Sequence, residues 1–572
     1  MQTDVDSLEN DTLIELDICI IGAGPAGLIL AHAFIGTNFT VSLLESGGLS
    51  KNSKIQKLSE GTLSGDLSEP IDQTHIRQVG GTANHWIIKM ADKRYGYRYA
   101  PFDAIDFEKR EGLPYSGWPI QKTDLDTYYA EVVAKCEIGP YQFNSQSWTN
   151  SSTDTLKLDP EKIISDVFMF GPTKKFTQDF PSDISKSSNI NLFTNATVVE
   201  LLTSKCGSLT EVAIIKTFTG KTIRFRAKQF ILATNALQTP RLLLNSRKTH
   251  SQGIGNQHDN VGRYYMDHSL VSSGNFYLFD AKKINEFGFY DMRLIAGTSV
   301  LGKLKLSKEI MKKQQLRNMT ATLFPMPTFN DVEALSSVKN IATAIANRQL
   351  PAELKKNILA IYKGKSHVLR VLYEKLRYDT PIMPGFGRGG WSKLTNNEQK
   401  YQRLELLSFV EQSPNPDNRV TLINEIDELG CKKINLHFKW DEGDIASIRK
   451  AQKIFADSLN QTGLGHFELP EDFSIHPNRL AGLHHMMGTC RMSESAKDGV
   501  VDKNCKVFGM QNLYIAGSAV FATGSYANPT LTNLALSVRI ADIVKKELIG
   551  ISYPVKDSVN LKPSASPVNL AP

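Results

Sequence analysis

The chain lacks the cysteine patterns and the long apolar runs that mark several protein classes. Its 6 cysteines contain no Cys-x-x-Cys pair, so neither a zinc or iron–sulfur site nor a disulfide framework is expected. No run reaches the roughly 18 apolar residues that a membrane-spanning helix needs. Residues 1–16 are acidic and have no apolar core. No secretory signal is therefore expected, and we predict a cytoplasmic protein.

The charge balance also lacks a strong bias. The formal net charge of +7 is spread over 572 residues, which is too dilute to predict nucleic-acid binding. With 41% hydrophobic and 22% charged residues, the composition is that of a globular protein rather than a disordered or fibrous one. The length is ample for a large core, and it favours two interleaved domains over one.

A dinucleotide-binding pattern opens the chain. Asp17–Ile21 is short and apolar, which is typical of a buried parallel strand. Three glycines follow: Gly22 suits a tight turn, Gly24 allows the backbone to approach a pyrophosphate closely, and Gly27 allows strand–helix packing. The helix expected over Leu28–Phe34 presents its N-terminal amides to phosphate oxygens.

An acidic residue completes this pattern. Val41–Leu44 is expected to be the second strand, and Glu45 follows it, 18 residues beyond Gly27. A carboxylate at this place can accept the ribose hydroxyls of a dinucleotide. Because it would repel a 2′-phosphate, Glu45 argues against NADP.

Further elements are predicted from apolar periodicity and turn residues. We expect strands at Asn189–Leu202, Ala227–Thr234 and Asn512–Gly517, a hairpin over Glu211–Phe225 that turns at Gly220, a hairpin joining Ser408–Gln412 to Arg419–Leu422, and helices at Lys122–Cys136, Arg241–Leu244 and Leu531–Leu548.

Motifs spread along the chain carry a family resemblance. Near the C-terminal end, His485 begins the pattern His-x-x-Gly-Thr-Cys-Arg-Met, and Asn528 follows 43 residues later in Asn-Pro-Thr. The other motifs are Gly80-Gly81-x-x-x-His85-Trp86, Asn235-Ala236-x-x-Thr239-Pro240-Arg241, Gly262-Arg263 with Asp267-His268, and the Pro414–Leu422 segment. In this order they resemble the glucose–methanol–choline (GMC) family of FAD-dependent oxidoreductases, most closely its pyranose-oxidase and fructose-dehydrogenase-like branches.

The resemblance implies an α/β fold and FAD as the cofactor. A Rossmann-like FAD-binding domain would be interleaved with an α+β substrate domain built on a largely antiparallel sheet. The implied boundaries are 1–110, 189–269 and 474–550 for FAD binding, 111–188 for a connecting cap segment, 270–473 for the substrate domain and 551–572 for a flexible tail. The implied FAD-binding residues are Gly22, Gly24, Gly27, Glu45, Gly80, Gly81, His85, Val198, Ala233, Gly517, Asn528 and Thr530.

Some relatives carry FAD covalently on a histidine in the position of His85, and the residues around His85 match that pattern only loosely.

By the same resemblance, we expect the protein to oxidise a CH–OH group to a carbonyl, namely a secondary alcohol of a sugar, glycoside or other polyol-like molecule. Histidine suits the removal of the hydroxyl proton, because its pKa is near neutral. The resemblance gives this role to His485, with hydride transfer to flavin N5, while Asn528 holds the substrate oxygen. The neighbouring His484 lacks the spacing of the motif and is expected to pack behind the site or reach solvent. His268 is expected to pack between the domains.

Alternatives remain open at this stage. The substrate can instead be a hydrophobic or natural-product alcohol of a biosynthetic pathway, and the same scaffold can serve a redox-silent lyase or pass electrons to a partner protein. Either oxygen or an external acceptor can reoxidise the flavin, and no metal is expected. Glu411 and Gln412 are candidate substrate-binding residues, of which strand alternation allows only one to face a substrate. The stretch 352–378 is basic and amphipathic, and we expect it to pack on its own domain rather than to bind a membrane or a partner. Pro384–Trp391 is a candidate lid.

Overall fold

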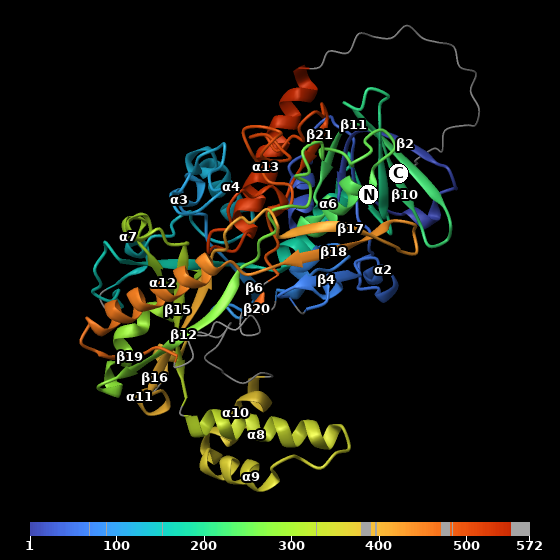
Figure 1. Ribbon diagram of the computed structural model, residues 1–572. Coiled ribbons are helices and arrows are strands. Elements are labelled where there is room, and N and C mark those ends of the chain that lie inside the picture. Colours follow the sequence, from blue (N-terminus) through green and yellow to red (C-terminus); the bar gives the residue numbers. More distant parts are fainter. Residues whose placement is uncertain are drawn as a thin grey trace, which may run out of the picture.

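The computed structural model describes residues 1–67, 69–86, 88–150, 153–327, 329–378, 390–394, 397–470, 481–482 and 484–550. Two large sheets and one small sheet form its framework (Figure 1). Most of the predicted lid and the whole predicted tail lie outside the described residues. None of the described helices has the length and apolar character needed to cross a membrane.

The first sheet has eight strands and holds the dinucleotide pattern. Its order is β1 (Gln2–Asp4), β8 (Ile190–Thr194), β3 (Val41–Leu44), β2 (Leu13–Ile21), β11 (Thr222–Leu232), β10 (Thr210–Lys216) and β9 (Val198–Thr203), and β21 (Leu513–Ile515) pairs with β11. The strands from β1 to β11 and β21 pair in parallel. Ile18, Ile20, Leu43 and Phe230 are fully buried, as expected for parallel strands covered on both faces.

The parallel strands bring distant parts of the chain to one edge. Gly22 follows β2, Glu45 follows β3, Ala233 follows β11 and Gly517 lies just beyond β21. Since ligands bind outside the carboxyl ends of parallel strands, this edge is where a dinucleotide is expected.

The second sheet has ten strands, which pair in antiparallel fashion. Its order is β19 (Gly465–Glu468), β12 (Ser269–Leu278), β16 (Arg403–Val410), β15 (Met319–Met326), β14 (Thr298–Leu306), β7 (Ile163–Pro172), β6 (Tyr95–Tyr99) and β5 (Ile88–Lys89), with β13 (Met292–Ile295) on β14 and β20 (Ala481–Gly482) on β12. The α/β fold class with a largely antiparallel second sheet is confirmed. The sheet takes in β5, β6 and β7, which precede the expected substrate domain.

The predicted hairpin between Ser408–Gln412 and Arg419–Leu422 is wrong. β16 pairs with β12 and β15, whereas β17 (Arg419–Ile426) pairs with β18 (Lys432–Phe438), which pairs with β4 (Gly61–Gly65) in the small third sheet. The polar residues between β16 and β17 explain the difference, because Ser413 bonds Asp444 and Asn418 bonds the backbone of Lys439. The connection therefore runs from one sheet to another.

Helices pack over the first sheet, and another helix packs beside an edge strand of the second sheet. α13 (Thr530–Gly550) packs against α1 (Pro25–His32) and α4 (Asp126–Lys135), and α12 (Glu442–Asn460) packs beside β19. The helix expected over Arg241–Leu244 begins earlier, since α6 spans Asn235–Asn245. The Asn235 side chain accepts hydrogen bonds from the amides of Leu237 and Gln238, which caps the first turn.

One predicted strand is divided in two. Asn189–Leu202 forms β8 and β9, and Asn195 between them has a left-handed backbone with φ of 56°. Asparagine tolerates this conformation better than most residues, so the chain turns there. The hairpin at Gly220 is confirmed by the pairing of β10 with β11.

Candidate functional site

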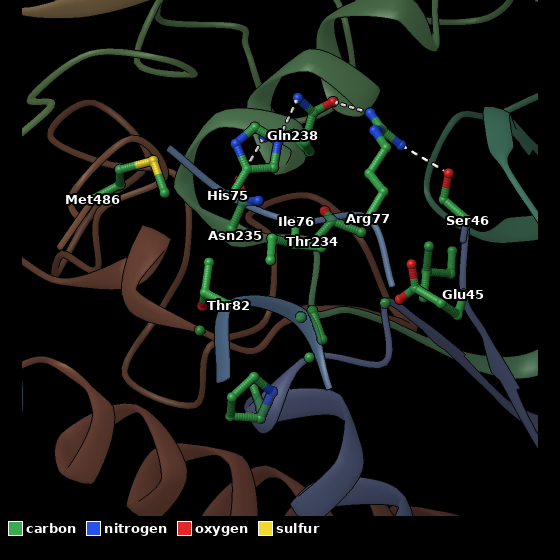
Figure 2. A pocket seen from close by; sticks show the side chains of 18 of the residues that line it. Glu45, Ser46, His75, Ile76, Arg77, Thr82, Thr234, Asn235, Gln238 and Met486 are labelled. Carbon is green, nitrogen blue, oxygen red and sulfur yellow. Dashed lines mark hydrogen bonds between the residues drawn. The ribbon is translucent and has the colours of Figure 1, made fainter. Parts of the chain in front are cut away.

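A cavity of about 370 Å³ lies at the carboxyl edge of the first sheet (Figure 2). It runs from the loop after β3 to the start of α13. Its lining includes ten of the predicted site residues, namely Gly22, Gly24, Glu45, Gly81, His85, Val198, Ala233, His485, Gly517 and Thr530. Segments separated by several hundred residues therefore form one site.

Close backbone contacts require glycine at three positions in and around the first loop. A Cβ at Gly22 would lie 2.5 Å from the Ala233 carbonyl oxygen, and one at Gly27 would lie 1.8 Å from the Gly22 carbonyl oxygen. A Cβ at Gly81 would lie 3.0 Å from the Cα of Gly24. Gly24 is the N-cap of α1 and offers no side chain to the first amides of that helix. These amides are available to a phosphate group.

Glu45 is held by backbone amides at the far end of the cavity. Its Oε2 accepts from the Ala23 amide and its Oε1 from the Gly47 amide, each at 2.9 Å. Burial raises the pKa of Glu45, while these amides and Arg77 oppose the shift. Each carboxylate oxygen has a further lone pair, so Glu45 can also accept hydrogen bonds from the hydroxyl groups of a ligand in the cavity.

A chain of polar side chains that the sequence reasoning missed lies beside Glu45 (Figure 2). Arg77 donates from Nη2 to Oε1 of Gln238 at 2.7 Å and from Nη1 to Oγ of Ser46 at 2.9 Å. Gln238 in turn lies 3.3 Å from Nε2 of His75. Burial, Arg77 and Arg241 lower the pKa of His75 to about 3, so the ring is neutral and accepts the Gln238 amide proton. The only signal in the sequence was the position of Arg77 just before the Gly80–Gly81 motif.

Three polar groups meet at the other end of the cavity. Nε2 of His485 lies 2.9 Å from Nδ2 of Asn528 and 2.8 Å from the Tyr97 hydroxyl. Nδ2 of Asn528 donates to the same Tyr97 hydroxyl at 3.0 Å. The structure thus brings the predicted pair together, and it adds Tyr97, whose ring stacks on Trp86.

A second histidine determines which nitrogen of His485 carries the proton. His268 lies with Nε2 3.0 Å from the Gly524 carbonyl oxygen and with Nδ1 2.9 Å from Nδ1 of His485. A carbonyl only accepts, so Nε2 of His268 holds a proton and, in the neutral ring, Nδ1 accepts. His485 therefore donates from Nδ1, which leaves its Nε2 with a lone pair that accepts from Asn528 and Tyr97.

Burial keeps this histidine pair neutral. Burial lowers the pKa of His268 to about 4. Burial, followed by His268 and Arg98, holds the pKa of His485 well below its ordinary value. His485 is then an unprotonated base at neutral pH.

The amide of Asn528 is oriented by a buried arginine. Arg98 donates from Nε to Oδ1 of Asn528 at 2.8 Å, and its guanidinium lies 3.6 Å from the ring centroid of Phe409. Because Arg98 only donates, the contact identifies Oδ1 and directs the Nδ2 donor to His485.

The remaining predicted residues do not line the cavity. Gly27 and Gly80 are not among the lining residues, and Asn528 reaches the lining through His485. Glu411 is fully buried in an ion pair with Arg110 and accepts from the Asn318 amide. Gln412 accepts from the Asp267 amide. Both side chains have structural partners, and substrate contact remains a prediction for them.

His484 turns away from its neighbour. Its backbone has a φ of 57°, and its Nε2 lies 2.7 Å from a carboxylate oxygen of Glu69. The side chain is about one third exposed at 32%, so it reaches solvent as expected while still bordering the cavity.

Comparisons with known proteins relate this chain to one family of oxidoreductases. Residues 414–537 match a family model described as GMC oxidoreductase. The chain is 23% identical to the fructose dehydrogenase large subunit of Gluconobacter japonicus over 95% of this chain and 99% of that one. It is 22% identical to the 6'''-hydroxyparomomycin C oxidase of Streptomyces lividus over 95% of this chain and 94% of that one. A variant of the formate oxidase of Aspergillus oryzae, studied for its FAD modification, has a similar fold, with a TM-score of 0.54, 15% identity and coverage of 95% and 100%.

Proposed function

Because the chain belongs to the GMC oxidoreductase family and is an FAD-dependent oxidoreductase, we propose that it oxidises a CH–OH group of a sugar, glycoside or similar polyol to a carbonyl. The observation that carries this proposal is the group formed by His485, Asn528 and Tyr97 at one end of the cavity. The match to a fructose dehydrogenase along nearly its whole length supports the sugar class of substrate.

The residues that line the cavity would hold the parts of FAD in turn, from the adenosine half to the flavin ring. Glu45 and Val198 would hold the adenosine half, and Gly24 with the first amides of α1 would hold the pyrophosphate. Gly81, Gly517 and Thr530 also line the cavity, and the flavin ring would lie at its His485 end. When bound, FAD supplies the acceptor for the substrate hydride.

The Tyr97 hydroxyl marks where an alcohol oxygen can bind. It accepts from Nδ2 of Asn528 and donates to Nε2 of His485. A substrate hydroxyl in its place would make the same two contacts, and its proton would pass to Nε2 of His485. Asn528 would meanwhile hold the oxygen and fix the direction of the neighbouring C–H bond.

We propose that FAD is held without a covalent bond. His85 borders the cavity, and burial lowers the pKa of its ring. The residues Thr82, Ala83 and Asn84 that precede it match the covalent pattern only loosely. Acid precipitation is then expected to leave the yellow colour in the supernatant, whereas colour in the pellet would contradict this assignment.

Anaerobic titration tests the proposed function. The holoenzyme is mixed without oxygen with a panel of sugars, glycosides and aliphatic alcohols, and the visible flavin band is recorded. We expect a sugar or glycoside to bleach this band, because the flavin is reduced as the alcohol is oxidised. Bleaching by aliphatic alcohols alone would overturn the substrate class. Turnover without bleaching would show lyase chemistry instead.

A further inference from the structure

Three helices form a group at one end of the molecule, next to the ten-stranded sheet (Figure 1). They are α8 (Phe329–Ala346), α9 (Leu354–Lys363) and α10 (Lys365–Tyr378), and α8 packs against both of the others. The inner faces of α9 and α10 include Asn357, Ala360 and Val368, which are buried. Packing on the protein therefore uses only one side of these helices.

The outer side of α9 and α10 is apolar and exposed. Ile358, Leu359 and Tyr362 are 55%, 54% and 66% exposed, and Leu369 on α10 is 66% exposed. We define the apolar patch as Leu354, Ile358, Leu359, Tyr362, Leu369, Leu372 and Tyr373. Residues 354, 358 and 362 are four apart, so they share one face of α9. An apolar surface that gathers on one face marks an interaction site, unlike apolar residues scattered singly.

The segment around the patch is rich in exposed apolar side chains. Of the 19 large apolar side chains that are exposed in the described part of the chain, 9 lie between Ile345 and Tyr373. The predicted packing of stretch 352–378 on its own domain therefore holds for the inner face only.

The same segment is strongly basic. Between Leu354 and Tyr378 the sequence has seven lysines and arginines and one acidic residue, against a net charge of +7 for the whole chain. Lys355, Lys356 and Lys363 are exposed on α9, and among them Lys356 pairs with Glu353. A second copy of the chain would bring the same positive charge to this face, which disfavours self-association through it.

We propose that α9 and α10 dock this protein on an anionic lipid bilayer. The apolar patch lies at the boundary between headgroups and acyl chains, and the lysines extend to the lipid phosphates. Both features are needed by such a surface, since apolar burial supplies affinity and positive charge selects anionic lipid. The attachment is peripheral, and it goes beyond the oxidation chemistry of the cavity.

Vesicle co-sedimentation of the full-length holoenzyme tests this docking. The probes are vesicles of phosphatidylcholine alone and vesicles that also contain phosphatidylglycerol, at low and high salt. We expect the protein to sediment with the anionic vesicles at low salt and to be released by high salt, which screens the lysines. Failure to bind anionic vesicles would overturn the proposal. This holds even if an acidic protein is found to bind the same helices.

Matched variants locate the binding surface. Ile358→Ser/Leu359→Ser/Tyr362→Ser removes apolar groups, and Lys355→Gln/Lys356→Gln/Lys363→Gln removes three charges. Each lysine near an anionic surface contributes about fivefold, so the second variant is expected to bind on the order of a hundredfold less tightly. The control Leu49→Ser/Leu209→Ser/Ile426→Ser changes exposed apolar residues elsewhere and should bind like the parent. Equal binding by all three variants, with unchanged thermal unfolding, would contradict the assignment.

Discussion

At the scale of single residues, His268 determines which ring nitrogen of His485 carries the proton. From the sequence, His268 is expected only to pack between the domains. His268 belongs to the Asp267–His268 motif, and its contact with the Gly524 carbonyl fixes its own tautomer. That tautomer requires His485 to donate from Nδ1 and leaves Nε2 as the base. His268 is therefore a positioning residue, because it acts on the reaction through His485.

Replacing His268 with Phe removes the acceptor for Nδ1 of His485. We expect flavin reduction by substrate to slow by about tenfold to a hundredfold, part of the usual contribution of a general base, with little change in KM. The pKa of His485 should rise once His268 is gone, so the acid limb of the pH–rate profile should move to higher pH. Stopped-flow reduction over a pH series measures both effects.

The variant His268→Gln provides the matched comparison, because its side-chain oxygen can accept from Nδ1. It should recover part of the rate, while the acid limb should stay where His268→Phe places it, because a neutral amide does not repel the protonated ring of His485. A purely structural role would instead lower stability and flavin content in both variants and leave the acid limb at its position in the parent.

The sequence predicts the residues whose roles follow from a local motif. Gly22, Gly24 and Glu45 lie where the strand–glycine–helix pattern places them, and His485 lies beside Asn528 as the family motifs require. Tyr97 and Arg98 carry no such signal, because their contacts arise only when β6 lies beside Asn528, more than 400 residues further along the chain.

At the scale of elements, the connection between β16 and β17 shows how buried polar groups direct the chain. Glu411 directly follows β16 and pairs with Arg110, from the loop after the short helix α3 (Ala104–Phe107). Both side chains are nearly inaccessible to solvent. Burial raises the pKa of Glu411, Arg110 lowers it, and the net shift is downward. The ion pair therefore stabilises the fold above the usual carboxyl pKa and is lost as the pH falls through the lowered value.

Removing one partner should be costly. Glu411→Ala leaves the Arg110 charge buried, so we expect the free energy of unfolding at neutral pH to fall by about 3–5 kcal/mol. Urea unfolding followed by fluorescence measures this loss. The double variant Arg110→Met/Glu411→Leu should recover part of it, because neither charge of the pair is then buried without the other. A loss below about 1 kcal/mol in Glu411→Ala would show that the pair contributes little.

Strands are predictable here where apolar runs end at turn residues. β3 has its predicted bounds, and the β10–β11 hairpin turns at Gly220. The β16–β17 hairpin is wrong for a tertiary reason, since the partners of Ser413 and Asn418 lie in α12 and just after β18. Local turn chemistry cannot reveal such partners.

At the scale of the whole molecule, one cavity joins the two ends of the chain. Gly22 and Glu45 come from the first fifty residues, whereas His485 and Thr530 come from the last hundred. The sequence predicts this convergence through the family motifs. It does not predict the exposed apolar patch, because the burial of an amphipathic helix depends on what the rest of the fold places against it.

We propose His485 as the base in an FAD-dependent oxidation. The most direct test of this proposal is anaerobic flavin reduction by the best substrate in the parent holoenzyme, in His485→Ala and in the surface control His466→Ala. We predict that His485→Ala retains its flavin and is reduced about 10²- to 10⁴-fold more slowly, while the control matches the parent. Reduction of His485→Ala at the parent rate would contradict the account.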